Sequence, residues 1–455
     1  MKYFLQRLVV FCLVLILSGC SNPNQTDEKI DTTIDDSQQK KLVVWTHEFP
    51  SFNEGIQKKW IPEFEASHPS VTIEYVTIPY SGEVVSFDTR LLAEVSSGGG
   101  PDIWAMASFN FTEEKYIEAG LLAPLDPAIF GYASVDDLLN DYPPNSLSVF
   151  VRDGKIYGLL NELTTLCLFY NLDVFDEVGI PYLDSEKPTS WQEIARIGEQ
   201  ITQRDEITDE PSRLGYQFGF FANYPSPQWY IQNFYPILRQ YGQNDIYINV
   251  KPSVETEAFY NSLQLFYDFT HTYRIYDPYF IKDWFADFSN NRTAMVTAGP
   301  WFPSALQPET RFGVAPHPVV NPDDPETYQN IMYSFGWVVN ANLDDEKSQL
   351  AQEFLAFMLG KKGEAEQPLW WFENVGILQP RTAFLQSPEY ETIINRDSWM
   401  KCFIDTFDTY EVDYYQHSSD KPGMALIRAI DRVVYNEISP KDSAELLQNE
   451  LLLLP

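Results

Sequence analysis

The sequence predicts an α/β protein built on a mostly parallel sheet that helices cover. Two short apolar segments, residues 42–45 and 103–106, and one alternating segment, residues 71–76, have the patterns of strands. Two segments between them carry apolar residues at helical spacing: Ile56, Trp60 and Phe64 in the first, and Leu91, Leu92 and Val95 in the second. A repeated strand–helix order of this kind favours parallel strands joined by covering helices.

Later segments also have helical patterns. Residues 190–193 read Ser-Trp-Gln-Glu, a capping box that predicts the start of a helix with Ile194, Ile197 and Ile201 facing inward. Two further helices are expected from apolar residues on one face: Leu350, Phe354, Phe357 and Met358 in one, and Ile427, Ile430 and Val434 in the other. We therefore expect helices along the whole folded region.

Length and charge limit the classes of protein that fit. The 455 residues are enough for two or three domains with large cores, at about 100–200 residues a domain. There are 65 acidic and 31 basic residues, a formal charge of −34. Because phosphate groups repel such a surface, the composition argues against general nucleic-acid binding and against a grip of the folded part on anionic lipid.

The N-terminus has the pattern of an export signal followed by an anchor. Lys2 and Arg7 precede an apolar run over residues 8–17, which is shorter than the roughly 20 residues of a membrane span. We therefore expect a signal peptide over residues 1–19. The sequence Leu-Ser-Gly-Cys that ends at Cys20 resembles the bacterial lipobox, in which the cysteine is lipidated and begins the mature chain. The alternative is an ordinary signal peptide with an incidental cysteine.

Residues 20–40 are expected to form a lipidated, flexible tether. The segment has only two strongly apolar residues, Ile30 and Ile34, so it cannot build a core. The folded part would then lie outside the cytoplasm, anchored to the bacterial cell membrane through lipid on Cys20. Cys167 and Cys402 remain in the folded part, and the sequence does not tell whether they pair. An apolar surrounding at Cys167 favours a buried thiol there.

Motifs for catalysis and for metal binding are absent from the sequence. It contains no GxSxG, HExxH, Walker A or GxGxxG pattern, and its five histidines are not spaced as a metal pair on one helix face. We therefore expect no catalytic residue, no cofactor and no metal. A glycosidase needs only two carboxylates, however, and the many acidic residues keep that alternative open.

Several segments match a known family in the same order along the chain. They are Val-Val-Trp-Thr-His-Glu at 43–48, Gly-Gly-Gly-Pro-Asp-Ile-Trp-Ala-Met at 98–106, Asp-Gly-Lys-Ile-Tyr-Gly-Leu at 153–159, Pro-Thr-Ser-Trp-Gln-Glu at 188–193, Arg-Thr-Ala-Met-Val-Thr-Ala-Gly-Pro-Trp at 292–301 and Gln-Pro-Arg at 379–381. Together they resemble the extracellular solute-binding proteins of family 1, the maltose-binding-protein-like lipoproteins of sugar ABC transporters. The resemblance covers about residues 40–385, and the segment at 292–301 is its most specific part.

This resemblance implies a two-lobe periplasmic-binding-protein-like fold, with a hinge and a ligand cleft between the lobes. The N-terminal lobe would comprise residues 41–162 and 325–362, and the C-terminal lobe residues 163–324 and 363–455. Crossings between the lobes are expected near 160–166, 312–328 and 360–376. The implied function is that of a monomeric substrate-binding protein that delivers a sugar or oligosaccharide to the permease of an ABC importer. The alternatives are a carbohydrate-active lipoprotein enzyme with paired carboxylates and a binding protein that feeds a sensor.

The candidate ligand-binding residues follow from this resemblance and from the chemistry of sugars. Open α/β sheets bind ligands beyond the carboxyl ends of their strands, and aromatic rings cover the C–H faces of sugars. The candidates are Trp301, Trp229, Trp337, Trp371, His47, Glu48, Tyr80, Ser108 and Glu162. Trp301 is expected at the cleft rim with one face free, and Trp229 in an exposed proline-rich loop.

Other conspicuous residues have a structural role in this interpretation. Trp60, Trp104 and Trp191 are expected in the core. Arg381 is expected to form a structural salt bridge, although a clamp on a ligand carboxylate is the alternative. Glu162 lies near the first expected crossing and would serve either the hinge or the ligand.

Overall fold

The computed structural model describes residues 39–78, 84–107, 116–144, 146–222, 227–404, 421–436 and 438–454. The predicted signal peptide, Cys20, most of the tether, Tyr80 and Ser108 lie outside these residues. Within the described residues, no helix combines the length and the apolar character that a membrane crossing requires.

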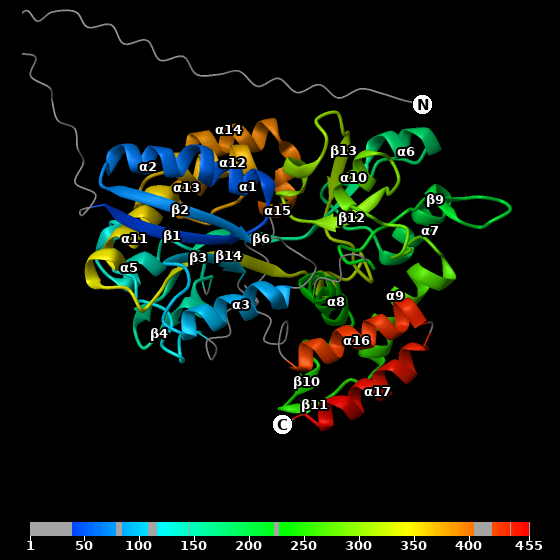
Figure 1. Ribbon diagram of the computed structural model, residues 1–455. Coiled ribbons are helices and arrows are strands. Elements are labelled where there is room, and N and C mark those ends of the chain that lie inside the picture. The colour runs from blue at the N-terminus through cyan, green and yellow to red at the C-terminus, as the bar shows by residue number, and fades with distance from the viewer. Residues whose placement is uncertain are drawn as a thin grey trace, which may run out of the picture. The chain divides into compact units, whose positions relative to one another are not determined.

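The first sheet has five strands in the order β2 (Val71–Ile78), β1 (Lys40–His47), β3 (Ile103–Ala107), β14 (Met332–Val339) and β6 (Gly158–Thr165) (Figure 1). β1 runs parallel to β2 and to β3, as the strand–helix order predicts. β14 pairs antiparallel with β3 and with β6, so the sheet is mixed. The three strands expected near the N-terminus are therefore confirmed, and two strands from later segments extend their sheet.

Helices on both sides complete a core around this sheet, which we call the first core. They are α1 (Pro50–Gly55), the π-helical turn η2 (Ile56–Trp60), α2 (Ile61–Ser67), α3 (Val84–Ser96), α11 (Asp345–Leu359) and α12 (Glu366–Val375). Ile56, Trp60 and Phe64 are buried in the first core, as their spacing predicts. Pro62 is accommodated because the π turn before it widens the helix, and the Ile61 N–H bonds to the Ile56 carbonyl.

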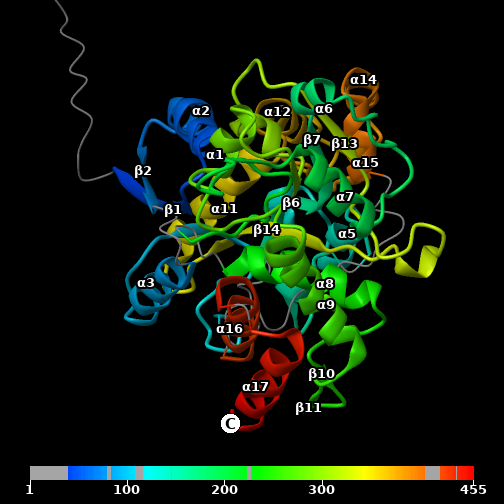
Figure 2. The same cartoon turned by 90° about the vertical axis from the view of Figure 1, so that its right-hand side faces the viewer.

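The second sheet has three strands, and its core is separate. β7 (Cys167–Asn171) lies between β12 (Met295–Ala298) and β13 (Phe312–Ala315) and pairs antiparallel with both. The helices around it are α6 (Leu172–Val178), α7 (Trp191–Ile201), α8 (Pro227–Gln240), α9 (Glu257–Tyr267), α10 (Trp284–Ser289), α16 (Lys421–Asn436) and α17 (Pro440–Leu452). We call their shared interior the second core. Figure 2 shows α16 and α17 beside α8 and α9.

The capping box at the start of α7 is confirmed in part. The Ser190 hydroxyl accepts a hydrogen bond from the Glu193 N–H at 3.1 Å, which satisfies one of the free amide groups of the first turn. Ile194, Ile197 and Ile201 are buried in the second core, as predicted. The Glu193 side chain contacts Arg196 instead of reaching back to the cap.

The other short elements connect these layers. They are η4 (Pro127–Phe130), α5 (Val135–Leu139), η5 (Ser148–Phe150), β4 (Val151–Arg152), β5 (Lys155–Ile156), β8 (Gln203–Arg204), β9 (Pro211–Arg213), β10 (Tyr247–Ile248), β11 (Lys251–Pro252), η6 (Asp268–Thr272), η7 (Phe302–Ala305), η8 (Pro325–Thr327), α13 (Thr382–Leu385), α14 (Pro388–Arg396), η9 (Ser398–Met400) and α15 (Lys401–Ile404). β4–β5, β8–β9 and β10–β11 are two-stranded antiparallel pairs.

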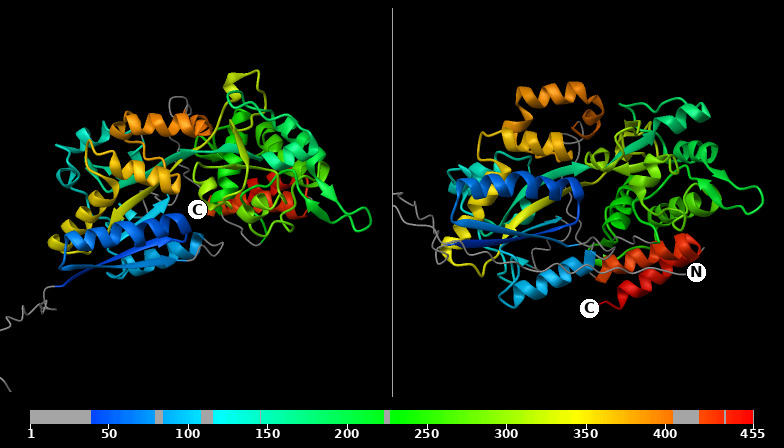
Figure 3. Two further views of the ribbon diagram at one scale, coloured as in Figure 1. Left: turned by 90° about the horizontal axis from the view of Figure 1, so that it is seen from above. Right: turned by 45° about the horizontal axis from the view of Figure 1, so that its top comes forward.

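The chain passes from the first sheet to the second through one residue. β6 ends at Thr165 and β7 begins at Cys167, so only Leu166 lies between the two strands. Both views in Figure 3 show this stretch running from one sheet to the other. The chain returns between the end of β13 at Ala315 and the start of β14 at Met332. The first passage lies at the end of the expected range 160–166, and the second begins after Ala315 and ends at Met332, later than the expected range 312–328.

The third change of core comes later than expected. Trp371, Val375 and Ile377 lie in the first core, although the expected boundary after residue 362 would give α12 to the second lobe. After them, Leu378, Phe384, Tyr390, Ile393 and Met400 form a small third cluster with Phe372. The boundary at 362–363 therefore cuts through residues that pack with the first core, because α12 rests its ring side chains on α1 and η2.

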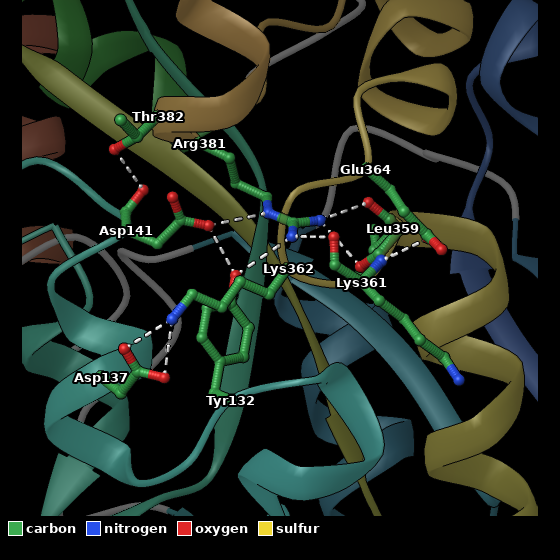
Figure 4. A network of polar contacts seen from close by, with 10 residues as sticks. Tyr132, Asp137, Asp141, Leu359, Lys361, Lys362, Glu364, Arg381 and Thr382 are labelled. Carbon is green, nitrogen blue, oxygen red and sulfur yellow. Dashed lines mark hydrogen bonds and ion pairs between the residues drawn. The ribbon is translucent and has the colours of Figure 1, made fainter.

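Arg381 holds this later part of the chain against the first core (Figure 4). Its side chain is 2% exposed, and it donates hydrogen bonds to the backbone carbonyls of Leu359, Gly360 and Lys361. It also bonds to the Tyr132 hydroxyl at 3.1 Å and faces the Asp141 carboxylate at 3.5 Å. All of these partners belong to the protein, so the expected structural role of Arg381 is confirmed.

Candidate functional site

The two cores meet at Trp301, which follows β12. Its ring lies 5.8 Å from the ring of Trp229 and 5.7 Å from that of Trp284, both in the second core. On the other side, the ring of Phe49 meets it edge-on at 6.1 Å. Phe49 follows β1 and packs against both cores. The motif that most specifically resembles the family therefore ends at the junction of the two cores.

A buried hydrogen bond joins Trp301 to the first sheet. Its indole N–H donates to the hydroxyl of Tyr333 on β14 at 2.8 Å. Gly299 makes this approach possible, since a Cβ there would lie 2.3 Å from Trp301 Nε1 and 2.7 Å from the Tyr333 hydroxyl. A side chain at position 299 would therefore displace the indole, the phenol or both.

The environment of Trp301 differs from the expected one. Its side chain is 8% exposed, so it does not stand at a rim with one face free. The expectation fails because several aromatic residues from different parts of the chain converge on it, and the sequence does not show that convergence. Trp301 therefore has a packing role in this structure, and any ligand contact would use the small part of the ring that remains accessible.

Glu162 is a buried acid beside this junction. It lies on β6 opposite Phe335 of β14, next to a bulge between Phe335 and Gly336. The residue is 4% exposed, and its Oε1 atom has no hydrogen-bond partner in the described part of the chain. Burial raises the pKa of Glu162 to about 8. Tyr333 pairs with Thr164, two residues after Glu162, and burial followed by the Glu162 charge raises the pKa of Tyr333.

Amide side chains near Glu162 also have unpaired polar atoms. The Asn161 carbonyl oxygen and both polar atoms of the Gln379 side chain are buried without a hydrogen-bond partner among the described residues. Leu163 N–H donates to the Leu378 carbonyl at 3.0 Å, which holds Gln379 next to β6. Such groups usually find a partner, because leaving one buried and unpaired costs about 1–3 kcal/mol. β6 and the neighbouring residue Gln379 thus carry several buried polar groups that are able to bind a polar ligand.

His47 and Glu48 lie at the carboxyl end of β1, as expected. The His47 ring is half-buried and lies 5.2 Å from the ring of Phe335. Burial lowers the pKa of His47 to about 4, so the imidazole is neutral near pH 7. Glu48 is exposed, and its backbone N–H donates to the Ile78 carbonyl at 3.0 Å. His47 therefore reaches the residues of the junction, and Glu48 faces solvent.

Two of the predicted tryptophans belong to the first core. Trp337 is fully buried with its ring 5.9 Å from that of Phe52, and Trp371 is fully buried with its indole N–H bonded to the Met358 carbonyl at 3.0 Å. The extra residue of the β-bulge is Asn161 on β6, and β14 stays in regular register with β3 through Trp337, whose ring packs into the first core beyond Phe335. Neither ring can meet a ligand without opening the first core, which corrects both expectations.

Trp229 is also placed differently from the prediction. It lies in the first turns of α8 instead of an exposed loop, because Pro227 begins that helix. The residue is 5% exposed, and a Cβ on Gly219 would come within 2.6 Å of its ring. Its contact with Trp301 supports the junction from within the second core. Trp60, Trp104 and Trp191 are buried, as expected.

The structure adds residues that the sequence did not indicate. They are Tyr333, Phe335, Phe49, Trp284, Asn161 and Gln379. Only Phe49 had an available signal, since it directly follows His47 and Glu48 at the end of a strand. No group of three or more His, Cys, Asp and Glu residues in the described ranges is arranged to hold a metal ion.

The comparisons with known proteins agree with this architecture. Residues 49–365 match the family described as bacterial extracellular solute-binding protein. The match covers more than half of the chain, so the protein belongs to this family, whose members lie outside the cytoplasm.

Relatives and solved structures are similar at low sequence identity. The arabinooligosaccharide-binding protein of Bacillus subtilis is 23% identical over 45% of this chain, and the match spans only 42% of that relative. The galactooligosaccharide-binding protein of the same organism is 25% identical over 76% of this chain and 74% of its own length. The maltose/maltodextrin-binding domain of Bdellovibrio bacteriovorus, solved with maltotriose, superposes with a TM-score of 0.72 at 18% identity, over 90% of this chain and 98% of that one. The fold is thus the two-lobe periplasmic-binding-protein-like fold.

The buried acid gives a testable pH dependence of stability. The folded Glu162 carboxyl keeps its proton up to about pH 8, whereas in the unfolded chain it ionises near its ordinary pKa of 4.5. The folded state therefore binds more protons between these values, and the contribution of Glu162 to stability falls by roughly 1.4 kcal/mol for each pH unit in this window. Below the window and above it, this group adds no pH dependence.

We predict that Glu162→Gln abolishes the fall in folding stability with rising pH, because glutamine has the shape of glutamate but cannot ionise. In urea unfolding at several pH values, the variant should gain stability over the wild type as pH rises from about 5 to about 8, and no further above that. Glu199→Gln, an exposed change on α7, is the control and should follow the wild type throughout. A constant difference between Glu162→Gln and the wild type at all pH values would contradict the assignment.

Proposed function

We propose that this protein is the lipid-anchored, extracytoplasmic substrate-binding component of an ABC importer and that its ligand is a sugar or oligosaccharide. The observation that carries the proposal is the junction itself, where aromatic rings and unpaired buried polar groups from both cores come together. The names of the relatives support the choice of ligand, since they include binding proteins for arabino- and galacto-oligosaccharides.

The chemistry of the junction suits a carbohydrate. Aromatic faces cover the apolar C–H side of a sugar ring, while hydroxyl groups need both donors and acceptors. Glu162 is mostly protonated near pH 7, so its carboxyl group can donate one hydrogen bond and accept others. Asn161 and Gln379 supply further amide groups. We propose Trp301, Glu162 and His47 as contacts, with Glu48, Tyr80 and Ser108 as further candidates at the strand ends.

Ligand binding would change the relation of the two lobes. We propose one lobe that holds residues 41–165 and 332–396 and a second that holds residues 167–315 and the chain from Trp399 onward. A ligand that touches both lobes binds the closed arrangement better than the open one, and this difference in affinity drives closure. The closed, loaded monomer would then deliver the sugar to the permease.

Two alternatives for the function remain to be tested. Glu162 has the raised pKa of a glycosidase acid, but its cause is burial and not a neighbouring carboxylate. Chromatography of the bound sugar after long incubation should return it intact, whereas turnover that disappears in Glu162→Gln would establish an enzyme. A binding protein that feeds a sensor would bind the same sugar, and deletion of the permease would then leave the response to that sugar in place.

The ligand class can be tested by thermal-shift screening against arabino-, galacto- and malto-oligosaccharides. A ligand present at 100 times its dissociation constant stabilises the folded protein by about 2.7 kcal/mol, which is readily measured. We expect at least one sugar to raise the melting temperature in a concentration-dependent way. A panel in which no sugar stabilises the protein would contradict the proposal.

We predict that Trp301→Leu weakens binding of the stabilising sugar at least tenfold, about 1.4 kcal/mol, because the aromatic face is lost. Trp337→Leu is the matched control, since it removes a fully buried tryptophan of the first core. Both variants should melt at lower temperature, but Trp337→Leu should bind normally in its folded fraction. Equal affinities of the two variants by isothermal titration calorimetry would remove Trp301 from the site.

We also predict that membrane attachment requires Cys20. Without this thiol no lipid can be added, so Cys20→Ala should be released from membranes or remain unprocessed. Cys12→Ala, within the apolar run of the signal, is the control and should be processed and retained. Cell fractionation followed by immunoblotting measures how each variant is distributed between the membrane and soluble fractions. A processed Cys20→Ala protein that stays in the membrane fraction would contradict lipid anchoring at Cys20.

A further inference from the structure

Cys167 and Cys402 lie next to each other although they are far apart in the sequence. Cys167 is the first residue of β7, directly after the passage between the sheets, and Cys402 lies on the short helix α15. Both side chains belong to the second core, with exposures of 0% and 9%. The structure records both as free thiols.

Aromatic packing fixes the position of α15 on the second sheet. The ring of Phe169, two residues after Cys167, lies 6.0 Å from the ring of Phe403 and 6.0 Å from that of Trp399. Trp399 also meets Phe312 of β13 at 5.6 Å. These contacts hold the strand after Cys167 against the residues on both sides of Cys402, so the proximity of the thiols is a property of the packed core.

The two thiols also lie close enough to affect each other's ionisation. Burial, and then the neighbouring Cys402 thiol, raise the pKa of the Cys167 thiol well above its ordinary value. A thiol in such surroundings reacts slowly once the protein has folded.

We propose that Cys167 and Cys402 form a disulfide bond in the exported protein. Proteins outside the cytoplasm meet oxidising conditions in which neighbouring cysteines pair. The only other cysteines in the sequence are Cys12, inside the predicted signal, and Cys20, the predicted lipid site. These two are therefore committed elsewhere under the proposed processing, which leaves Cys167 and Cys402 as the pair in the folded part.

The reaction is an exchange with a disulfide-bearing thiol oxidoreductase or a small-molecule disulfide. One thiolate attacks the oxidant disulfide and forms a mixed disulfide, and the second thiolate then attacks the sulfur of the first cysteine. Cys167 and Cys402 together lose two protons and two electrons, and the oxidant is reduced from a disulfide to two thiols. Because Cys167 is unreactive once buried, the bond forms during folding after export.

The bond would tie α15 to the start of β7 without joining the two lobes. Both cysteines belong to the second core, so the bond leaves closure of the lobes free. Its main effect is on the unfolded chain, whose entropy falls when a long loop is closed.

Peptide mapping of the full-length exported protein tests the bond directly. The protein is denatured in N-ethylmaleimide without reductant, digested and analysed by mass spectrometry. We expect a linked pair of peptides that contain Cys167 and Cys402, with both residues labelled only after reduction. Quantitative labelling of both thiols without reduction would overturn the proposal.

Thermal unfolding provides a second readout that separates the bond from simple packing. Reductant should lower the melting temperature of the wild type, and it should leave Cys167→Ala, Cys402→Ala and the double variant unchanged. The two single variants and the double variant should show the same loss of the disulfide contribution. A wild-type melting temperature that does not respond to complete reduction would contradict a stabilising bond.

Discussion

The structure depends on one constraint of connectivity: a single buried residue, Leu166, separates a strand of the first sheet from a strand of the second. Because β6 and β7 form nearly continuous extended chain, the two cores cannot move apart freely. β14 pairs with β6 and brings Tyr333 and Phe335 to this place, while β12 pairs with β7 and ends just before Trp301. The junction is therefore a consequence of strand pairing on both sides of Leu166.

The polar groups at the junction explain why this place is the best candidate for binding. Glu162, on β6, is buried with a carboxyl oxygen that lacks a partner among the described residues. Such an arrangement lowers stability unless the oxygen gains a hydrogen bond. Natural proteins retain features that lower their folding stability mainly at functional sites. The Trp301 indole N–H donates to the Tyr333 hydroxyl oxygen, so part of the polar surface is already organised before a ligand arrives.

Sequence periodicity predicted the strands and helices well because burial repeats along each element. It predicted the early strands, the inward isoleucines of α7 and the core positions of Trp60, Trp104 and Trp191. Residue type alone could not separate a core tryptophan from a binding one. Trp337 packs against Phe52 in the first core, and the packing of α12 on α1 places Trp371 in the same core. Tyr333 and Gln379 were missed because strand pairing between distant segments places them.

Small-angle scattering of the protein with and without its stabilising sugar tests the central claim most directly, since that claim is closure of two lobes around a ligand at the junction. Saturation should lower the radius of gyration, because the lobes rotate toward each other about the short passages of the chain. Trp301→Leu should show the same change only at higher sugar concentration. Superimposable profiles of the free and the saturated wild type would contradict the account.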